Sequence, residues 1–145
     1  MENQKKVIFI VDDSIVNLTV GESALSDFYD VFTLNSGERL FKILQKITPD
    51  LILLDIEMPV LDGHEILRRL KANPETTDIP VIFLTGLSDE QTENIGLSLG
   101  AADYISKPFS PPLLLKRIEN QILIQSQKRK LEYYESKFSN QKPNS

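Results

Sequence analysis

The sequence contains no cysteine, and this absence excludes disulfides, thiol catalysis and zinc sites built from cysteine. No apolar run approaches the length of a membrane span. The run from Val7 to Val11 follows a charged N-terminus but stops at Asp12, so it is too short for the hydrophobic region of a signal peptide. Positive charge is in the minority, because the formal net charge is -5 at pH 7. This balance argues against a general affinity for nucleic acid or for anionic membranes. The lack of a signal-peptide pattern and of a membrane span predicts a cytoplasmic protein.

Histidine is also scarce, since His64 is the single one in the chain. It stands in a polar setting, and we predict that it is a solvated residue on a helix surface. Without histidine or cysteine near the acidic residues described below, nucleophilic serine or cysteine schemes have no candidate base. The sequence has neither a P-loop nor a G-x-G-x-x-G turn, so it does not indicate nucleotide binding.

Short apolar runs alternate with helical patterns along the 145 residues, a length that fits one domain. The runs predict five strands, over residues 6–11, 30–34, 51–55, 80–84 and 102–105. Apolar residues at helical spacing and capping signals predict helices over residues 15–28, 38–47, 63–72, 88–99 and from 110 to about 138. Such alternation implies right-handed crossovers and a parallel sheet with helices on both faces, an α/β fold.

Two of these predicted helices carry distinct local patterns. The first has an apolar face that we assign to Ile15, Leu18, Ala24, Leu25 and Phe28. The fourth begins with a capping box, in which a serine at position 88 is followed three residues later by a glutamine.

Polar side chains stand at the ends of four predicted strands. Asp12 and Asp13 follow the first strand, Asp55 ends the third, Thr85 follows the fourth and Lys107 comes soon after the fifth. Each alone could be a helix cap, a turn residue or a solvated charge. Together they would converge on one edge of a parallel sheet, where clustered carboxylates need a cation to stay ionised. Oxygen ligands suit Mg²⁺, and a lysine with a hydroxyl suits a phosphoryl group.

These residues lie in four motifs that resemble the response-regulator receiver domains of two-component signalling, the CheY-like family. The motifs are F-I-V-D-D-S at 9–14, L-I-L-L-D-I-E-M-P-V-L-D-G at 51–63, P-V-I-F-L-T-G at 80–86 and G-A-A-D-Y-I-S-K-P-F at 100–109. The resemblance covers roughly residues 5–125 and implies a flavodoxin-like, doubly wound five-stranded parallel sheet in the order 2-1-3-4-5. Residues 126–145 would then form a helical extension or linker with a disordered tail.

The resemblance also implies a role for each residue of the site. Asp55 would accept a phosphoryl group from a sensor histidine kinase or a histidine phosphotransfer protein. Asp12 and Asp13 would bind Mg²⁺ together with the Asp55 carboxylate and the backbone carbonyl of Glu57. Lys107 would pair with the phosphoryl oxygens, and catalysis would consist mainly of positioning and charge neutralisation. Such a domain is not an enzyme in the usual sense, because it catalyses only its own phosphorylation and dephosphorylation.

A switch follows from the same resemblance. The Thr85 hydroxyl would move to the phosphoryl group, and the Tyr104 ring would fill the space that it leaves. The surface formed by the fourth helix, the fifth strand and the fifth helix would then change shape. The Lys107–Pro108 peptide bond would be cis, which turns Lys107 towards the site. Asn17, Glu57 and Leu87 would line variable positions beside it.

The last helix is longer than the domain requires. Ile124, Leu131 and Phe138 are seven residues apart, with Tyr134 between, which suggests a heptad seam; a solvated extension is the alternative. The resemblance implies a C-terminal output domain, which these residues do not include. A homodimer could form through the extended helix or through the surface of the fourth helix, fifth strand and fifth helix.

Two other functions are compatible with parts of the pattern. An aspartyl-phosphate phosphohydrolase would share the nucleophile, but such enzymes resemble D-x-D sites, and Ile15 stands two residues after Asp13. The chain could also be an interaction or dimerisation module that works without phosphorylation.

Overall fold

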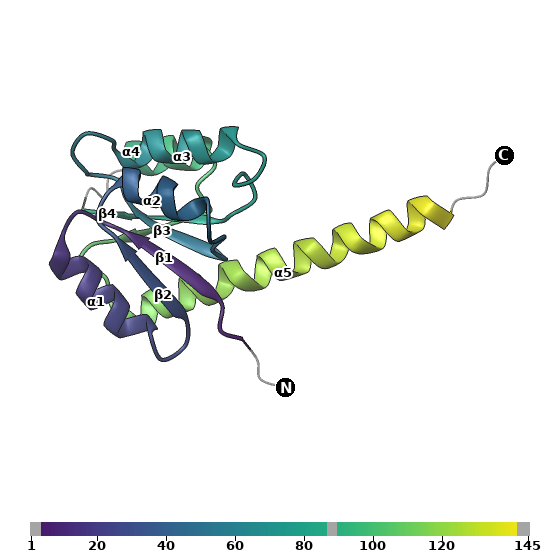
Figure 1. Cartoon of the computed structure of the whole chain (residues 1–145), viewed down its shortest axis with the longest axis horizontal. Helices are drawn as coiled ribbons and strands as arrows, with labels where there is room; N and C mark the ends of the chain where they lie inside the picture. The colour runs from purple at the N-terminus through teal and green to yellow at the C-terminus, as the bar shows by residue number, and fades with distance from the viewer. Residues whose placement is uncertain (1–3, 87–89, 142–145) are drawn as a thin grey trace.

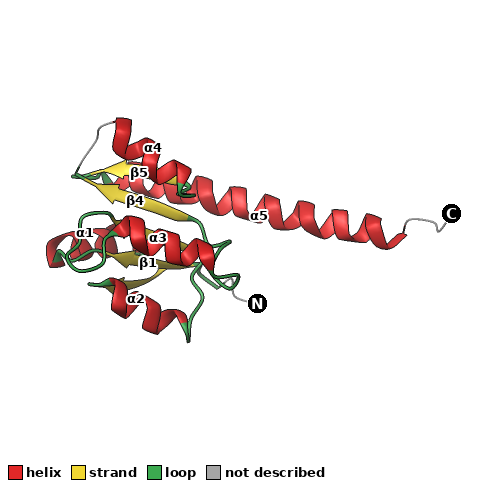
Figure 2. Cartoon of the chain, turned by 90° about the horizontal axis from the view of Figure 1, so that it is seen from above, coloured by secondary structure: helices red, strands yellow, loops and turns green. Residues whose placement is uncertain are grey.

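The computed structural model describes residues 4–86 and 90–141 of the chain. Five strands alternate with five helices in this part: β1 (Val7–Val11), α1 (Ile15–Leu25), β2 (Asp30–Leu34), α2 (Gly37–Leu44), β3 (Leu51–Asp55), α3 (Gly63–Ala72), β4 (Val81–Thr85), α4 (Glu90–Ser98), β5 (Asp103–Ser106) and α5 (Pro111–Gln141). The strands form one parallel sheet in the order β2-β1-β3-β4-β5 (Figures 1 and 2). The predicted doubly wound, flavodoxin-like fold is confirmed. No helix in the described part is long and apolar enough to cross a membrane.

The alternation of side chains along each strand divides the core into two layers. Phe9 of β1 and Phe83 of β4 point into the layer beneath α2, α3 and α4, whereas Ile8 and Ile10 point into the layer beneath α1 and α5. Figure 1 shows these two groups of helices on opposite sides of the sheet. Because β3 and β4 are covered on both faces, every residue in them is buried. This burial on both faces explains why the sequences of β3 and β4 are unbroken apolar runs.

Helix α1 differs from the sequence prediction in its end and in its apolar face. It ends at Leu25 rather than Phe28, and its buried residues are Leu18, Gly21 and Leu25. Ile15 and Phe28 are 74% and 59% exposed, so their assignment to the core was wrong. Ile15 lies about a quarter turn away from the buried stripe at about 3.6 residues per turn, and Phe28 lies beyond the helix.

His64 is not the solvated residue that we predicted. It is half-buried, and its ring packs edge-on against Phe83 with centroids 5.4 Å apart. The Nε2 atom is buried and has no hydrogen-bond partner among the described residues. The neighbouring Gly63 explains this position, since a Cβ there would lie 2.6 Å from the Asp55 carbonyl oxygen. The absence of that Cβ lets the first turn of α3 pack directly on the sheet.

The loop between β3 and α3 contains a strained residue. Val60 has a φ of 68°, and the Leu61 amide donates to the Pro59 carbonyl at 2.7 Å, which closes a tight γ-turn around it. A β-branched residue is rare in this conformation. The Val60 side chain is fully exposed, so no packing in the described part of the chain compensates for the strain.

The remaining differences concern the ends of elements. Helix α2 stops at Leu44 rather than at residue 47, while β4 and β5 each begin and end one residue later than predicted. The serine of the predicted capping box, Ser88, lies outside the described residues, as does Leu87. Helix α5 continues to Gln141, three residues past the predicted end, and runs far beyond the sheet (Figure 1).

Candidate functional site

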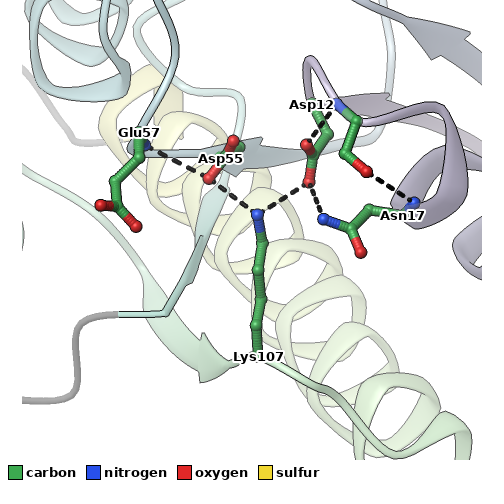
Figure 3. Close-up of polar contacts among 6 residues, drawn as sticks. Asp12, Asn17, Asp55, Glu57 and Lys107 are labelled. Atoms are coloured by element: carbon green, nitrogen blue, oxygen red, sulfur yellow. Dashed lines mark hydrogen bonds and ion pairs between the residues drawn. The ribbon is translucent and has the colours of Figure 1, made fainter.

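Asp12 lies where β1 ends, and its carboxylate is fully buried. The backbone carries it there because the Asp12 amide still bonds the Leu34 carbonyl at the edge of β2. Its Oδ1 accepts a hydrogen bond from the Ser14 amide at 2.9 Å, and its Oδ2 accepts one from Asn17 Nδ2 at 3.2 Å (Figure 3). Ser14 caps α1, so the helix start and the carboxylate are held by the same turn.

Asp55 is the last residue of β3 and is 1% exposed. Val11 and Leu54 are paired in the sheet register, so the residues that follow them, Asp12 and Asp55, leave adjacent strands side by side. The Oδ1 atom of Asp55 accepts a hydrogen bond from Lys107 Nζ at 2.9 Å and another from the Glu57 amide at 3.2 Å. Two carboxylates from different parts of the chain thus meet at the carboxyl edge of the sheet.

Lys107 joins the two carboxylates. Its Nζ lies 2.9 Å from Asp55 Oδ1 and 3.0 Å from Asp12 Oδ2 (Figure 3). The Lys107 amide donates to the Thr85 carbonyl at 2.8 Å, which fixes the loop after β5 against the end of β4. The peptide bond to Pro108 is cis, as predicted.

Burial and charge act in opposite directions on these groups. The pKa of Asp55 is raised from 3.8 to about 6, mainly because burial disfavours its charged form; the charge of Asp12 adds to this rise, and Lys107 opposes it. Burial alone would lower the pKa of Lys107, but its bonds to Asp55 and Asp12 raise it. The lysine therefore remains a cation, and it supplies positive charge to the two acids.

Asp13 completes an acidic cluster. Asp12, Asp13 and Asp55 each offer one carboxylate oxygen, and these oxygens lie within 4.8 Å of one another. Asp13 is exposed, so the cluster opens to solvent on that side. Hard oxygen ligands with room for water suit Mg²⁺, and the residues present therefore fit this ion. The part predicted for the Glu57 carbonyl stays a prediction.

Thr85 ends β4, next to the strand that carries Asp55, and Tyr104 lies on the neighbouring strand β5, paired with Phe83. Thr85 is 1% exposed and follows Leu84, the register partner of Asp55. Tyr104 is 9% exposed, and its ring lies 5.6 Å from the ring of Phe83. The Tyr104 hydroxyl occupies the place where a Cβ on Gly96 of α4 would be. The ring is thus inside the α4 layer in this structure, and the predicted movement of the pair stays a prediction.

Three features of the site escaped the sequence reasoning. The bond from Asn17 to Asp12 was missed, although a polar residue one turn into a helix that follows an acid is a readable signal. The contact between Gly96 and Tyr104 was missed because a glycine within a helical pattern does not reveal what lies against it. The left-handed backbone of Val60 had no signal in the sequence at all, since valine disfavours it.

The fold and this cluster define a class of protein: a doubly wound α/β domain with three carboxylates and a lysine at the carboxyl edge of its sheet. Comparison with known proteins gives the family, because residues 8–119 match the model described as the response regulator receiver domain. The chain belongs to this family, and the resemblance drawn from its motifs is confirmed.

Individual relatives agree with this assignment. The chain is 44% identical over 115 residues to a probable cyclic di-GMP phosphodiesterase of Vibrio cholerae serotype O1, a match that covers 79% of this chain and 26% of that protein. It is 43% identical over 121 residues to the probable transcriptional regulator ycf27 of Cyanophora paradoxa, covering 83% of this chain and 49% of the relative. The chain thus spans half or less of the length of these relatives.

A solved structure shows the same fold. The putative response regulator from Chloroflexus aurantiacus J-10-fl is 30% identical and superposes with a TM-score of 0.79, covering 83% of this chain and 99% of that one.

Proposed function

We propose that this chain is a Mg²⁺-dependent phosphoacceptor domain that receives a phosphoryl group on Asp55 from a histidine kinase or a histidine phosphotransfer protein. The observation that carries the proposal is the double contact of Lys107 with Asp55 and Asp12, two buried carboxylates on adjacent strands. A half-buried lysine between two buried acids at the open edge of a sheet is suited to hold the oxygens of a third anionic group.

The transfer needs one free oxygen on Asp55. Both Lys107 Nζ and the Glu57 amide contact Oδ1, so we assign Oδ2 as the nucleophile. Oδ2 forms a bond to phosphorus while the bond from phosphorus to the donor's imidazole nitrogen breaks, and the imidazole leaves. Lys107 then neutralises the oxygens of the acyl phosphate.

Mg²⁺, held by Asp12, Asp13, Asp55 and the Glu57 carbonyl, would supply the further positive charge that two adjacent anions require. Asn17 and the Ser14 amide bind Asp12 and keep its carboxylate in position.

The response to the phosphoryl group would pass through Thr85 and Tyr104. Thr85 is linked through its carbonyl to the Lys107 amide, so the phosphoryl-binding lysine and the hydroxyl are on one connected frame. We propose that movement of the Thr85 hydroxyl changes the packing of Tyr104 against Gly96 and thereby the surface of α4, β5 and α5.

A docking place for the phosphodonor lies on α1. Ile15, Val16 and Val20 are 74%, 71% and 43% exposed, and this apolar patch begins two residues after Asp13. We propose that a partner helix packs on this patch and presents its phosphohistidine to Asp55. The proposed receiver unit spans residues 5–125, with an output domain joined through the segment from residue 126 onward.

The test is labelling with a small phosphodonor, such as acetyl phosphate, in the presence of Mg²⁺. Intact mass should show one phosphoryl group on the native chain and on a control with Asp27→Asn, an exposed acid outside the site. The Asp55→Asn chain should remain unlabelled. Equal labelling of the Asp55→Asn chain would refute the assignment, and absence of labelling in every chain would favour an interaction module that works without phosphorylation.

A further inference from the structure

The second half of α5 has an exposed apolar stripe that the domain does not use. The C-terminal part of α5 projects away from the sheet as a single rod (Figures 1 and 2). On this rod Ile124, Leu131, Tyr134 and Phe138 are 53%, 59%, 52% and 73% exposed. Four large apolar side chains on one helical segment need a partner to remove them from water.

The stripe is on the face of α5 that points away from the domain. Helix α5 contacts its own domain through Ile118 and Ile122 in the core and through Gln125, whose Nε2 donates to the Asp78 carbonyl at 2.9 Å. At about 100° per residue, the row formed by Ile124, Leu131 and Phe138 lies roughly half a turn from these contacts. A partner helix can therefore approach the row without meeting the domain.

The spacing of this row is that of a coiled coil. Ile124, Leu131 and Phe138 fall at one core position of successive heptads, and Gln127 and Tyr134 fall at the other. We call these five positions the seam. Its five positions alternate at three and four residues, which keeps them on one side of a supercoiled helix.

The charged residues beside the seam favour a second copy of the helix as the partner, and they favour a parallel orientation of the two helices. In a parallel pair of these helices, Lys130 of one copy would face Glu135 of the other, and the symmetry of the pair would repeat this contact. In an antiparallel pair Lys130 would instead face Lys137, a repulsion that occurs twice and that offsets the attraction between Lys128 and Glu135. The sequence of this helix is thus complementary to itself in the parallel direction.

We propose that the partner is a second copy of this chain, and that residues 124–138 of the two copies form a parallel two-stranded coiled coil through the seam. The two domains then lie side by side at the N-terminal end of the pair, on the outer faces of the helices. This inference goes beyond the proposed phosphoacceptor role and does not depend on it.

The first experiment tests proximity by cross-linking. Because the chain has no cysteine, a single Gln127→Cys substitution gives one thiol per copy within the seam. The parallel pair places both thiols at the same level, so mild oxidation should join two copies by a disulfide. Ser136→Cys, on the face opposite the seam, is the matched control and should remain largely monomeric. Equal cross-linking of the two chains, or none in either, would overturn the proposal.

The second experiment tests direction through charge. In sedimentation equilibrium over a range of concentrations up to the millimolar, Lys130→Glu and Glu135→Lys should each weaken association, and the double variant should restore it. An antiparallel pair predicts the opposite sign for Lys130→Glu, which would then oppose Lys137. Lys116→Glu, an exposed residue in the first half of α5, controls for the change in net charge.

The third measurement tests the apolar contribution. Leu131→Asp should lower the association constant at least about tenfold, because it removes an apolar contact from both copies and buries a charge. The Asp55→Asn chain should associate as the native chain does, which separates this proposal from the phosphoacceptor assignment. A native chain that sediments as a monomer at every concentration would show that the seam does not form.

Discussion

Two regions of this protein place side chains against their usual preference, and they do so in opposite ways. At the carboxyl edge of the sheet, Asp12 and Asp55 are ionisable groups with at most 1% exposure. On the second half of α5, Leu131 and Phe138 are large apolar groups with more than half of their surface in water. The first region has its counter-charge within the chain, in Lys107, whereas the second has no partner in the described part of its own domain.

This difference indicates which partner each region needs: a cation at the acidic edge and an apolar surface at the second half of α5. Lys107 neutralises the acidic edge only in part, and the edge carries more negative than positive charge. Its charge therefore suits a cation, with which an anion can then bind. A second copy of α5 can cover the apolar stripe, because it presents the same row of apolar side chains and complementary charges. We therefore propose ligand binding for the sheet edge and self-association for the helix.

The largest effect is expected from removing the charge that joins the two acids. Lys107→Ala should lower the free energy of unfolding of the metal-free protein by about 3 kcal/mol, because two buried carboxylates lose their counter-charge. Urea unfolding with the exposed Lys116→Ala as the control measures this difference. A change as small as that of the control would mean that the acids are neutralised in another way.

Removing the negative charge of Asp55 should have the opposite effect and stabilise the protein. Burial holds the pKa of Asp55 at about 6 in the folded protein, above its ordinary value of 3.8. Between these two values the folded state binds more protons than the unfolded chain, so stability rises as the pH falls through 6 towards 4. Above pH 6 the ionised carboxylate opposes folding, and Asp55→Asn should therefore stabilise the metal-free protein by about 2 kcal/mol at pH 8.

Unfolding of the native and Asp55→Asn chains, measured across this pH range without Mg²⁺, distinguishes an effect of charge from an effect of packing. The gain from Asp55→Asn should shrink below pH 6 and vanish near pH 4, where both side chains are neutral. A gain independent of pH would assign the effect to packing instead of charge.

Val60 sharpens the comparison, because it is an exposed apolar residue that the seam does not include. Val60→Gly should raise the free energy of unfolding by about 1 kcal/mol, since glycine adopts a φ of 68° without strain. It should leave the association of the chain unchanged in sedimentation. If Val60→Gly weakened association, apolar exposure outside α5 would contribute to the interface.

The smallest effect on the fold is expected from the α5 stripe. Leu131→Asp should change the free energy of unfolding of the monomeric domain by no more than about 0.5 kcal/mol, because the side chain contacts solvent instead of the core. Thermal unfolding of dilute protein measures this, beside the association constant described above. A loss comparable with that of Lys107→Ala would place the second half of α5 within the cooperative unit of the domain.

Sequence reasoning was most successful where a residue's surroundings leave a periodic trace. The buried runs of β3 and β4 and the meeting of Asp12, Asp13, Asp55 and Lys107 at one edge were predicted from the residues and are found. The strand order, which the resemblance to receiver domains implied, is found as well. It failed where apolar character was taken as a sign of burial. Ile15 was assigned to the core of α1, but a quarter turn of the helix places it in water.

His64 shows the same limit from the other side. Its neighbours in the sequence are polar, but its neighbours in space are not, because Gly63 lets α3 approach the sheet closely enough for the ring to meet Phe83. Local composition does not record such a contact. The roles of Thr85 and Tyr104 as a switch remain a prediction, which Mg²⁺ and a phosphoryl mimic would test through NMR shifts at these two residues.

The sequence by itself determined the class of this protein, since periodicity specifies strands and helices, and the acids and lysine at strand ends specify the chemistry of an edge. Tertiary structure alone decided the distances that make the edge a site: Lys107 reaches Asp12 and Asp55 because β1, β3 and the loop after β5 meet in space, although up to 95 residues separate them in the chain. It also decided which face of α5 is left in water, because only the packing of Ile118 and Ile122 on the sheet fixes the rotation of the helix. Local sequence patterns specify the secondary structure and chemistry of each segment, and packing on the sheet determines which side chains lie next to one another.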